Sequence, residues 1–252
     1  MFSSAQTDQG EGKLRSIARH VVRYAVVLLL AAAAGARAHA PPPSEPLGFV
    51  PPAPGSYLLQ AIMPTPDGEV LDTLGRARGL AEFTRGKITL VGLIYTRCSD
   101  AEGCPRAWAA FAEVRRLIKT RPALARRTRL VSLSFDPAHD TPAVMKKVAG
   151  AAAGRDKSVE WDFLTTASPR KLWPILDGFG QDVRLNSETS EATEAPALSH
   201  TLKVFLIDRD GQVREIYTTS FLIPQVIVND VATLALEEAR APRAKELAGM
   251  SR

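Results

Sequence analysis

Two cysteines and one histidine are the residues of this sequence whose types and spacing could do chemistry. Cys98 and Cys104 stand six positions apart in the segment YTRCSDAEGCPRAW, and the chain has no other cysteine. A thiolate is both a nucleophile and a metal ligand, and a short loop can bring two sulfurs within bonding distance or onto one metal. The spacing therefore leaves three possibilities, namely a structural disulfide, a redox-active pair and a metal site.

A predicted strand and a predicted helix flank the two cysteines. Residues 87–96, KITLVGLIYT, form an apolar run rich in β-branched residues, which is typical of a buried parallel strand. A helix is predicted from 105 to 119, because Pro105 suits the first helical position and apolar residues follow at a spacing of three to four. Cys104 would then lie at a helix N-terminus, where unpaired N–H groups and the helix dipole favour the thiolate.

His200 stands just before a predicted β-hairpin, which consists of a strand at 201–207, the turn DRDG and a strand at 213–218. A βαβ unit followed by a hairpin and a closing helix predicts an α/β fold of the thioredoxin-like type, with a central mixed sheet flanked by helices. Residues 184–199 are polar and acidic and are predicted to be a surface loop. The remaining predicted elements are strands at 56–61, 69–72, 128–135 and 159–165 and helices at 142–152, 169–179 and 224–240.

Such a fold would bring His200 close to the two cysteines. The segment that enters the hairpin strand lies beside the N-terminus of the first helix, so Cys98, Cys104 and His200 could converge. Two thiolates and one imidazole form a soft site that suits copper(I), or copper(II) with an added weak ligand, and zinc could use the same set. His139 is predicted to be an exposed residue of the turn at 136–142.

Composition and charge exclude several other classes of protein. Two Cys and four His are too few for a multi-disulfide scaffold, a four-cysteine zinc ribbon or an iron–sulfur ferredoxin. The net charge of +5 suggests nucleic-acid binding, but residues 1–40 carry much of the excess, and the remainder has 27 basic against 25 acidic residues. We therefore expect no nucleic-acid partner. Walker loops, nucleophile elbows and zinc-protease motifs are absent from the sequence.

The first forty residues are predicted to be a signal peptide or an N-terminal membrane anchor. A basic segment precedes the apolar run YAVVLLLAAAAGA at 24–36, and small residues follow it. This run is shorter than the roughly 20 residues that span a bilayer. Export would place the domain in the periplasm or another oxidising extracytoplasmic compartment. The other predicted regions are a Pro-rich linker at 41–55, one domain at 56–240 and a basic C-terminal tail at 241–252.

The motifs together resemble the SCO/SenC family of copper-binding cytochrome c oxidase assembly proteins. They are Thr96-Arg97-Cys98 with Cys104-Pro105, the turn SFDPAHDTP at 134–142, His200-Thr201 and LIDRDG at 206–211, and the resemblance spans about residues 56–240. It implies a thioredoxin-like domain in which Cys98, Cys104 and His200 hold one copper ion, Cu(I) or Cu(II). Asp136 and Asp140 are expected to order the turn and cap the helix at 142–152, with Thr141 as its N-cap.

Two features depart from the family pattern. The family has Cys-x3-Cys, whereas this chain has Cys-x5-Cys, and the longer loop adds Asp100 and Glu102, whose charges would oppose thiolate formation. Family members usually carry an acidic residue before the distal histidine, where this chain has Ser199. These differences concern the metal site and leave the resemblance in fold intact.

The resemblance implies an exported metallochaperone that delivers copper to, or matures, the dinuclear copper centre of cytochrome c oxidase. Its partners would be the copper-centre subunit or other copper donor and acceptor proteins, and residues 24–36 could tether it to the membrane. The alternative is a thiol–disulfide oxidoreductase of the same fold, in which one of Cys98 and Cys104 attacks a disulfide and the other resolves it. A peroxidase-type thiol enzyme and a binding domain with a structural disulfide are further hypotheses.

Overall fold

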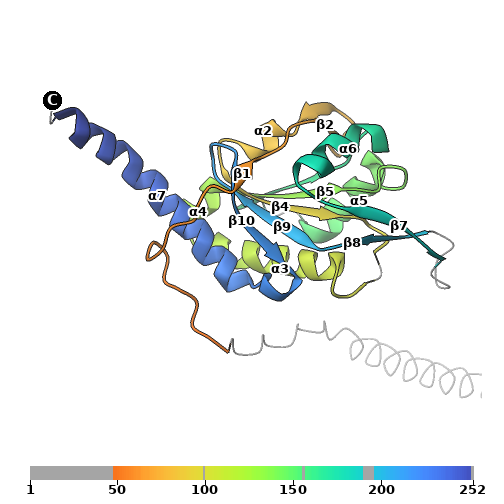
Figure 1. The fold of residues 1–252 in the computed structure, drawn as a ribbon, viewed down its shortest axis with the longest axis horizontal. Helices are drawn as coiled ribbons and strands as arrows, with labels where there is room; N and C mark the ends of the chain where they lie inside the picture. The colour runs from red at the N-terminus through yellow and green to blue at the C-terminus, as the bar shows by residue number, and fades with distance from the viewer. Residues whose placement is uncertain (1–47, 99, 155–156, 190–195, 251–252) are drawn as a thin grey trace, which may run out of the picture. The chain divides into compact units, whose positions relative to one another are not determined.

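The computed structural model describes residues 48–98, 100–154, 157–189 and 196–250, and only the backbone for 184–189, 196–200 and 241–250 (Figure 1). The predicted signal or anchor and the linker up to residue 47 lie outside the described residues. Val50–Arg252 forms one compact unit. All buried apolar residues of the described core fall between Leu59 and Leu234, so this unit contains its own hydrophobic core.

A mixed sheet forms the centre of this unit, as predicted, and the structure shows that it has six strands. Three of its strands are parallel neighbours, and the others are joined to them by antiparallel pairing. β4 is buried at every position because other elements cover both faces of the sheet. A strand buried in this way is rich in apolar residues on both faces, as the sequence of β4 is. The strand order is β1 (Met63–Pro64), β10 (Gln212–Thr218), β9 (Lys203–Ile207), β4 (Ile88–Ile94), β5 (Thr128–Ser134) and β6 (Glu160–Leu164).

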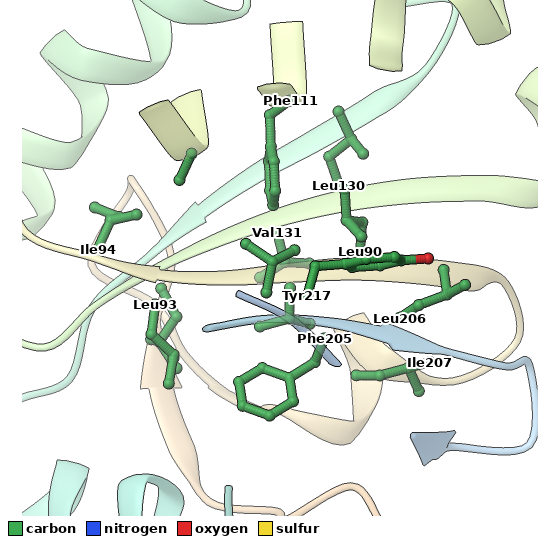
Figure 2. Close-up of a cluster of buried hydrophobic side chains, with 14 of the residues drawn as sticks. Leu90, Leu93, Ile94, Phe111, Leu130, Val131, Phe205, Leu206, Ile207 and Tyr217 are labelled. Atoms are coloured by element: carbon green, nitrogen blue, oxygen red, sulfur yellow. The ribbon is translucent and has the colours of Figure 1, made fainter. Parts of the chain in front are cut away.

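Helices cover both faces of the sheet. On one face lie α3 (Cys104–Lys119) and α7 (Pro224–Met250), which pack against each other and against β4. On the other lie α2 (Ala81–Thr84) and α6 (Pro169–Gly178) (Figure 1). Phe111 of α3 and Phe205 of β9 stand on opposite sides of the sheet (Figure 2), and Phe179, next to the end of α6, packs its ring 4.5 Å from that of Phe205.

Shorter elements complete the unit. The pair β2 and β3 forms a small antiparallel sheet, and so does the pair β7 and β8. Helix α4 leads directly into β5, and α5 connects β5 to β6 and packs against β6. Their bounds are β2 (Glu69–Leu71), β3 (Ala77–Gly79), α4 (Pro122–Arg127), α5 (Pro142–Ala152), β7 (Val183–Thr189), β8 (Pro196–His200) and the 3-10 helix η1 (Thr219–Phe221).

The segment at 56–61 is not the strand that its composition predicts. Side chains from elsewhere satisfy its polar groups, because Arg214 Nε donates to the carbonyl oxygen of Leu59 (2.8 Å) and the Tyr57 hydroxyl donates to Asp230 Oδ1 (2.5 Å). The Tyr217 hydroxyl donates to the second oxygen of Asp230 (2.7 Å). This segment is therefore a strap held against β10 and α7, and the first strand of the sheet begins only at Met63.

Two further predictions of secondary structure need correction. Much of 184–199, predicted as a surface loop, belongs to the antiparallel pair β7 and β8, with Val183 opposite His200. Backbone pairing forms such a ladder without the alternation of apolar residues on which the prediction depended. The last helix continues beyond residue 240 to Met250, so the segment predicted as a basic tail is helical at least to that point.

Gly92 in β4 tests the packing between the sheet and α3. A Cβ at this position would lie 3.0 Å from Phe111 Cζ, whereas a Cβ at Gly150 in α5 would meet nothing within 4 Å. We expect Gly92→Ala to lower the free energy of unfolding by about 1–3 kcal/mol through overpacking. Gly150→Ala should raise it by up to about 1 kcal/mol, since alanine is the better helix former. Urea unfolding of both variants checks this, and equal effects would contradict the packing.

Candidate functional site

The two predicted motifs meet at the carboxyl edge of the parallel strands. β4 and β5 run parallel in register, with Ile94 opposite Ser134, so the segments that follow them leave the sheet at the same edge. Residues 95–98 follow β4, and the turn at 135–141 follows β5. In open α/β sheets, binding sites form at this edge.

Asp140 connects these two segments. Its side chain is fully buried, and it accepts hydrogen bonds from the backbone N–H of Thr96 (2.9 Å) and from the Ser134 hydroxyl (2.6 Å). The Thr96 hydroxyl donates to its other oxygen. A buried carboxylate is stable only when its oxygens are hydrogen-bonded, and here both oxygens are. The position of Thr96, two residues before Cys98, therefore depends on the carboxylate of Asp140, which follows the neighbouring strand β5.

A second connection involves Arg97 and Asp136. Arg97 Nη2 lies 2.7 Å from Asp136 Oδ2, and the Asp136 carboxylate is only 9% exposed. The backbone N–H of Asp136 in turn donates to the Ser134 hydroxyl oxygen (3.0 Å). Both acidic residues therefore order the turn, as predicted, and both also hold the segment before Cys98, which sequence reasoning missed. Thr141 is the N-cap of α5, with its hydroxyl accepting from Val144 N (3.4 Å), which confirms that prediction.

The thiols of Cys98 and Cys104 contact each other. Cys104 begins α3 and is 2% exposed, with its sulfur accepting from the backbone N–H of Tyr95 at 3.4 Å. Cys98 is half-buried, and a hydrogen bond links the two thiols. A Cβ at Gly103 would lie 3.2 Å from the sulfur of Cys98, so a residue without a side chain is what leaves room for the thiol pair.

The hydrogen bond with Cys98, together with burial, raises the pKa of the Cys104 thiol well above its ordinary value. The expectation that the helix N-terminus favours a thiolate is therefore wrong for Cys104. A thiol that donates a hydrogen bond to a neighbouring sulfur and is shielded from water is harder to ionise. Because Cys98 is the more exposed of the two, it is the sulfur that a partner can reach first.

The long loop between the cysteines closes on itself through Asp100. The carbonyl oxygen of Asp100 accepts from Gly103 N, and its side-chain Oδ1 accepts from Glu102 N, both at 3.0 Å. Arg106, in the first turn of α3, pairs with Glu102 (2.5 Å). These contacts form a compact turn that brings the sulfurs together despite the Cys-x5-Cys spacing. Ser99 lies outside the described residues.

His200 ends β8 at the edge of the sheet that carries the cysteines. β9 and β4 are antiparallel, and Val204 of β9 is opposite Gly92 of β4. His200 lies four residues before Val204, and Thr96 lies four residues after Gly92, so both backbones are at the same edge of the sheet. Gln181 Nε2 anchors the adjoining segment by donating to the carbonyl oxygen of Thr201 (3.1 Å). The side chain of His200 lies outside the described part of the structure, so its approach to the sulfurs stays a prediction.

The described residues contain no group of three His, Cys, Asp or Glu side chains placed to hold a metal ion. Two of the three predicted ligands, Cys98 and Cys104, are therefore shown to lie together, and the third is placed only by its backbone. His139 is exposed in the turn after β5, as predicted.

Removing the Asp140 carboxylate tests whether it holds the cysteine segment. We expect Asp140→Ala to leave Thr96 N–H and the Ser134 hydroxyl without their acceptor, to lower the free energy of unfolding by about 3 kcal/mol and to expose Cys104. Reaction of Cys104 with an aromatic disulfide reagent should be faster in this variant than in the parent. The control is Asp177→Ala, at an exposed position of α6, which should leave the rate of Cys104 modification unchanged. Equal rates in the parent and in both variants would contradict the role of Asp140.

Solved structures with this fold include several Sco proteins. The copper-bound ScoI of Bradyrhizobium japonicum shares 22% identity, with a TM-score of 0.53, over 66% of this chain and 95% of its own. A SCO1/SenC family lipoprotein from Bacillus anthracis shares 22%, with a TM-score of 0.57, over 71% and 99%. BsSco, described as a cytochrome c oxidase assembly protein with a disulfide switch, shares 23%, with a TM-score of 0.52, over 69% and 95%. At these identities the likeness shows the thioredoxin-like Sco fold.

Family membership follows from the sequence as a whole. No curated protein has a sequence that matches this chain. The SCO1/SenC family model, however, matches residues 66–236, a segment that includes both cysteines, the turn after β5 and His200. Because this match covers more than half of the chain and agrees with the fold and with the motifs at the carboxyl edge of the sheet, the chain belongs to the SCO1/SenC family.

Proposed function

We propose that this protein binds one copper ion through Cys98, Cys104 and His200 and takes part in assembling the copper centre of cytochrome c oxidase. The observation that carries the proposal is the contact between the two thiols at the edge of the sheet where β8 ends. Family membership and the copper-bound ScoI support it. Two thiolates and an imidazole are soft ligands that suit copper in a low coordination number.

The difference in exposure between the cysteines suggests how copper would be passed on. Copper is cargo here, so it must leave as readily as it enters. Cys98 is half-buried and Cys104 is almost fully buried, so an incoming thiolate of a partner would replace Cys98 first and Cys104 last. Loading would release the proton of Cys104, whose pKa is raised by its hydrogen bond with Cys98 and by burial, so we expect copper affinity to rise with pH.

An extracytoplasmic, membrane-tethered location is part of the same proposal. The leader-like residues 1–40 support it, and so does the likeness to a lipoprotein of the family. The structure adds that none of the helices in its described part is both long and apolar enough to cross a membrane. The predicted partner is a copper-centre subunit of cytochrome c oxidase or another copper donor or acceptor protein.

A thiol–disulfide oxidoreductase is the second candidate, because the two thiols are in contact. The thiolate of the more exposed Cys98 would attack a disulfide in a partner and release one partner thiol. Cys104, once deprotonated, would then attack the sulfur of Cys98, release the second partner thiol and leave a Cys98–Cys104 disulfide. The partner gains two electrons, and an external dithiol must reduce this protein again. The disulfide switch described for BsSco favours this possibility.

Copper titration of the reduced protein separates the two candidates. We expect the parent to bind one copper ion per chain and Cys98→Ser, Cys104→Ser and His200→Ala each to weaken binding at least tenfold, the scale on which even residues that only orient metal ligands contribute. His139→Ala is the matched control, since His139 is exposed in a turn, and it should bind like the parent.

Several results would reject the copper site. Unchanged affinity in His200→Ala would rule out the third ligand, and equal losses in His139→Ala and His200→Ala would point to a general effect of removing a histidine. A parent that binds no copper but reduces a model disulfide would establish the oxidoreductase instead.

Gly103 offers a test that leaves all three ligands in place. A methyl group at this position would press on the Cys98 sulfur and on the carbonyl oxygen of Asp100. We expect Gly103→Ala to weaken copper binding about tenfold, the scale of changes that only reorient ligands. Gly150→Ala, where a Cβ meets nothing, should bind like the parent. Parent-like affinity in both would show that the spacing of the sulfurs does not depend on Gly103.

A further inference from the structure

Helices α4 and α7 enclose a groove of about 700 Å³. This groove is not part of the proposed copper and thiol site. Apolar side chains form its floor, among them Leu124 from α4 and Leu236 from α7, and Leu236 is 40% exposed. Exposed apolar surface that basic residues border is typical of an interaction site. The groove is lined by Arg121, Pro122, Ala123, Leu124, Arg126, Arg127, Ala232, Ala235 and Leu236.

The charged residues that line the groove in the described part of the structure are all basic. They are Arg121, Arg126 and Arg127. Arg127 contacts Glu238 (3.8 Å) and the carbonyl oxygen of Ala235 (3.2 Å). Arg121 and Arg126 are exposed, and among the described residues neither has an ion pair. Two guanidinium groups that pair with no described carboxylate, beside an apolar floor, suit a ligand that has an anionic head and a hydrocarbon body.

We propose that this groove binds an anionic phospholipid, with its phosphate between Arg121 and Arg126 and an acyl chain along the floor. The path of the chain favours a lipid over an acidic protein. Gly55, where the predicted Pro-rich linker ends, donates from its backbone N–H to Thr233 Oγ1 (2.9 Å) and lies against Leu236, which lines the groove. A domain tethered to a bilayer by such a linker meets lipid at a high effective concentration.

Lipid binding at this place would orient the proposed copper site. Helix α4 ends where β5 begins, whereas the cysteines follow the carboxyl end of β4, which is parallel to β5. A strand of seven residues separates these two edges by about 23 Å. A lipid bound between α4 and α7 therefore leaves the thiols on the edge that lies farther from the bilayer, where the extracytoplasmic part of a membrane protein could reach them.

Vesicle flotation tests the proposal without using copper or the tether. The protein used is the unit Val50–Arg252, which contains all of the described core. We expect it to float with vesicles of phosphatidylcholine and phosphatidylglycerol, to bind less at high salt and to stay unbound with phosphatidylcholine alone. Because a basic residue near an anionic surface contributes about 1 kcal/mol, Arg121→Gln/Arg126→Gln should lower the partition coefficient about thirty-fold.

A second charge variant distinguishes the groove from the overall charge of the domain. Lys147→Gln/Arg170→Gln removes the same charge from exposed positions on α5 and α6 and should bind nearly like the parent. Leu236→Ser should weaken the binding that remains at high salt, where apolar contact dominates. Circular dichroism confirms that each variant is folded.

Four outcomes would overturn the proposal. They are equal losses in the two charge variants, equal binding to neutral and anionic vesicles, no binding to either, and a dimer that only Arg121→Gln/Arg126→Gln dissociates. The last outcome would make the groove an interface between protein chains. Because copper is absent from this experiment, its failure leaves the copper proposal unaffected, and a failed copper titration leaves the lipid site unaffected.

Discussion

The buried carboxylate of Asp140 is the constraint on which the arrangement of this site depends. It lies after β5, yet its hydrogen-bond partners include the backbone and hydroxyl of Thr96, which follows β4. An unsatisfied buried carboxylate is unfavourable by several kcal/mol, so the two segments can hardly separate without exposing it to water. The Arg97–Asp136 ion pair adds a second connection between the same segments. The segment that leads to Cys98 is therefore held in a defined position relative to β5.

The two thiols show how packing changes the chemistry of a common residue type. Cys104 occupies the helix N-terminus that sequence reasoning associates with a thiolate, and yet its hydrogen bond with Cys98 and burial raise its pKa. Cys98 is more exposed, and Gly103 leaves room for its sulfur. This asymmetry suits both proposed activities, because each needs one accessible sulfur that reacts first and one protected sulfur that follows.

The opposite edges of the sheet have different surfaces. The carboxyl edge holds the thiols, the buried carboxylates and the end of β8. The other edge adjoins the groove between α4 and α7, where the charged residues that the structure describes are all arginines. Most of the excess positive charge of the whole chain lies in residues 1–40, so net charge alone is a poor guide to where this domain binds anions. The distribution of arginines over the folded surface is the informative quantity.

Much of the fold could be predicted from local sequence. The apolar runs at 87–96 and 128–135 and the N-cap at Thr141 correspond to β4, β5 and α5. The strap at 56–61 could not be predicted, because Arg214 and Asp230, which satisfy its polar groups, lie more than 150 residues away in the chain. The pair β7 and β8 also escaped prediction, because its polar sequence gives no alternating pattern.

The sequence by itself determined the residue types at the candidate site, the strands and helices that flank the cysteines, and the family resemblance, because these depend on residue identity and local spacing. Only the tertiary structure decided that Asp140 anchors the segment before Cys98 and that the longer loop still brings the sulfurs into contact. It also decided that Cys104 is the protected thiol. Each of these depends on which groups exclude water from one another, and that is established only when distant segments pack together.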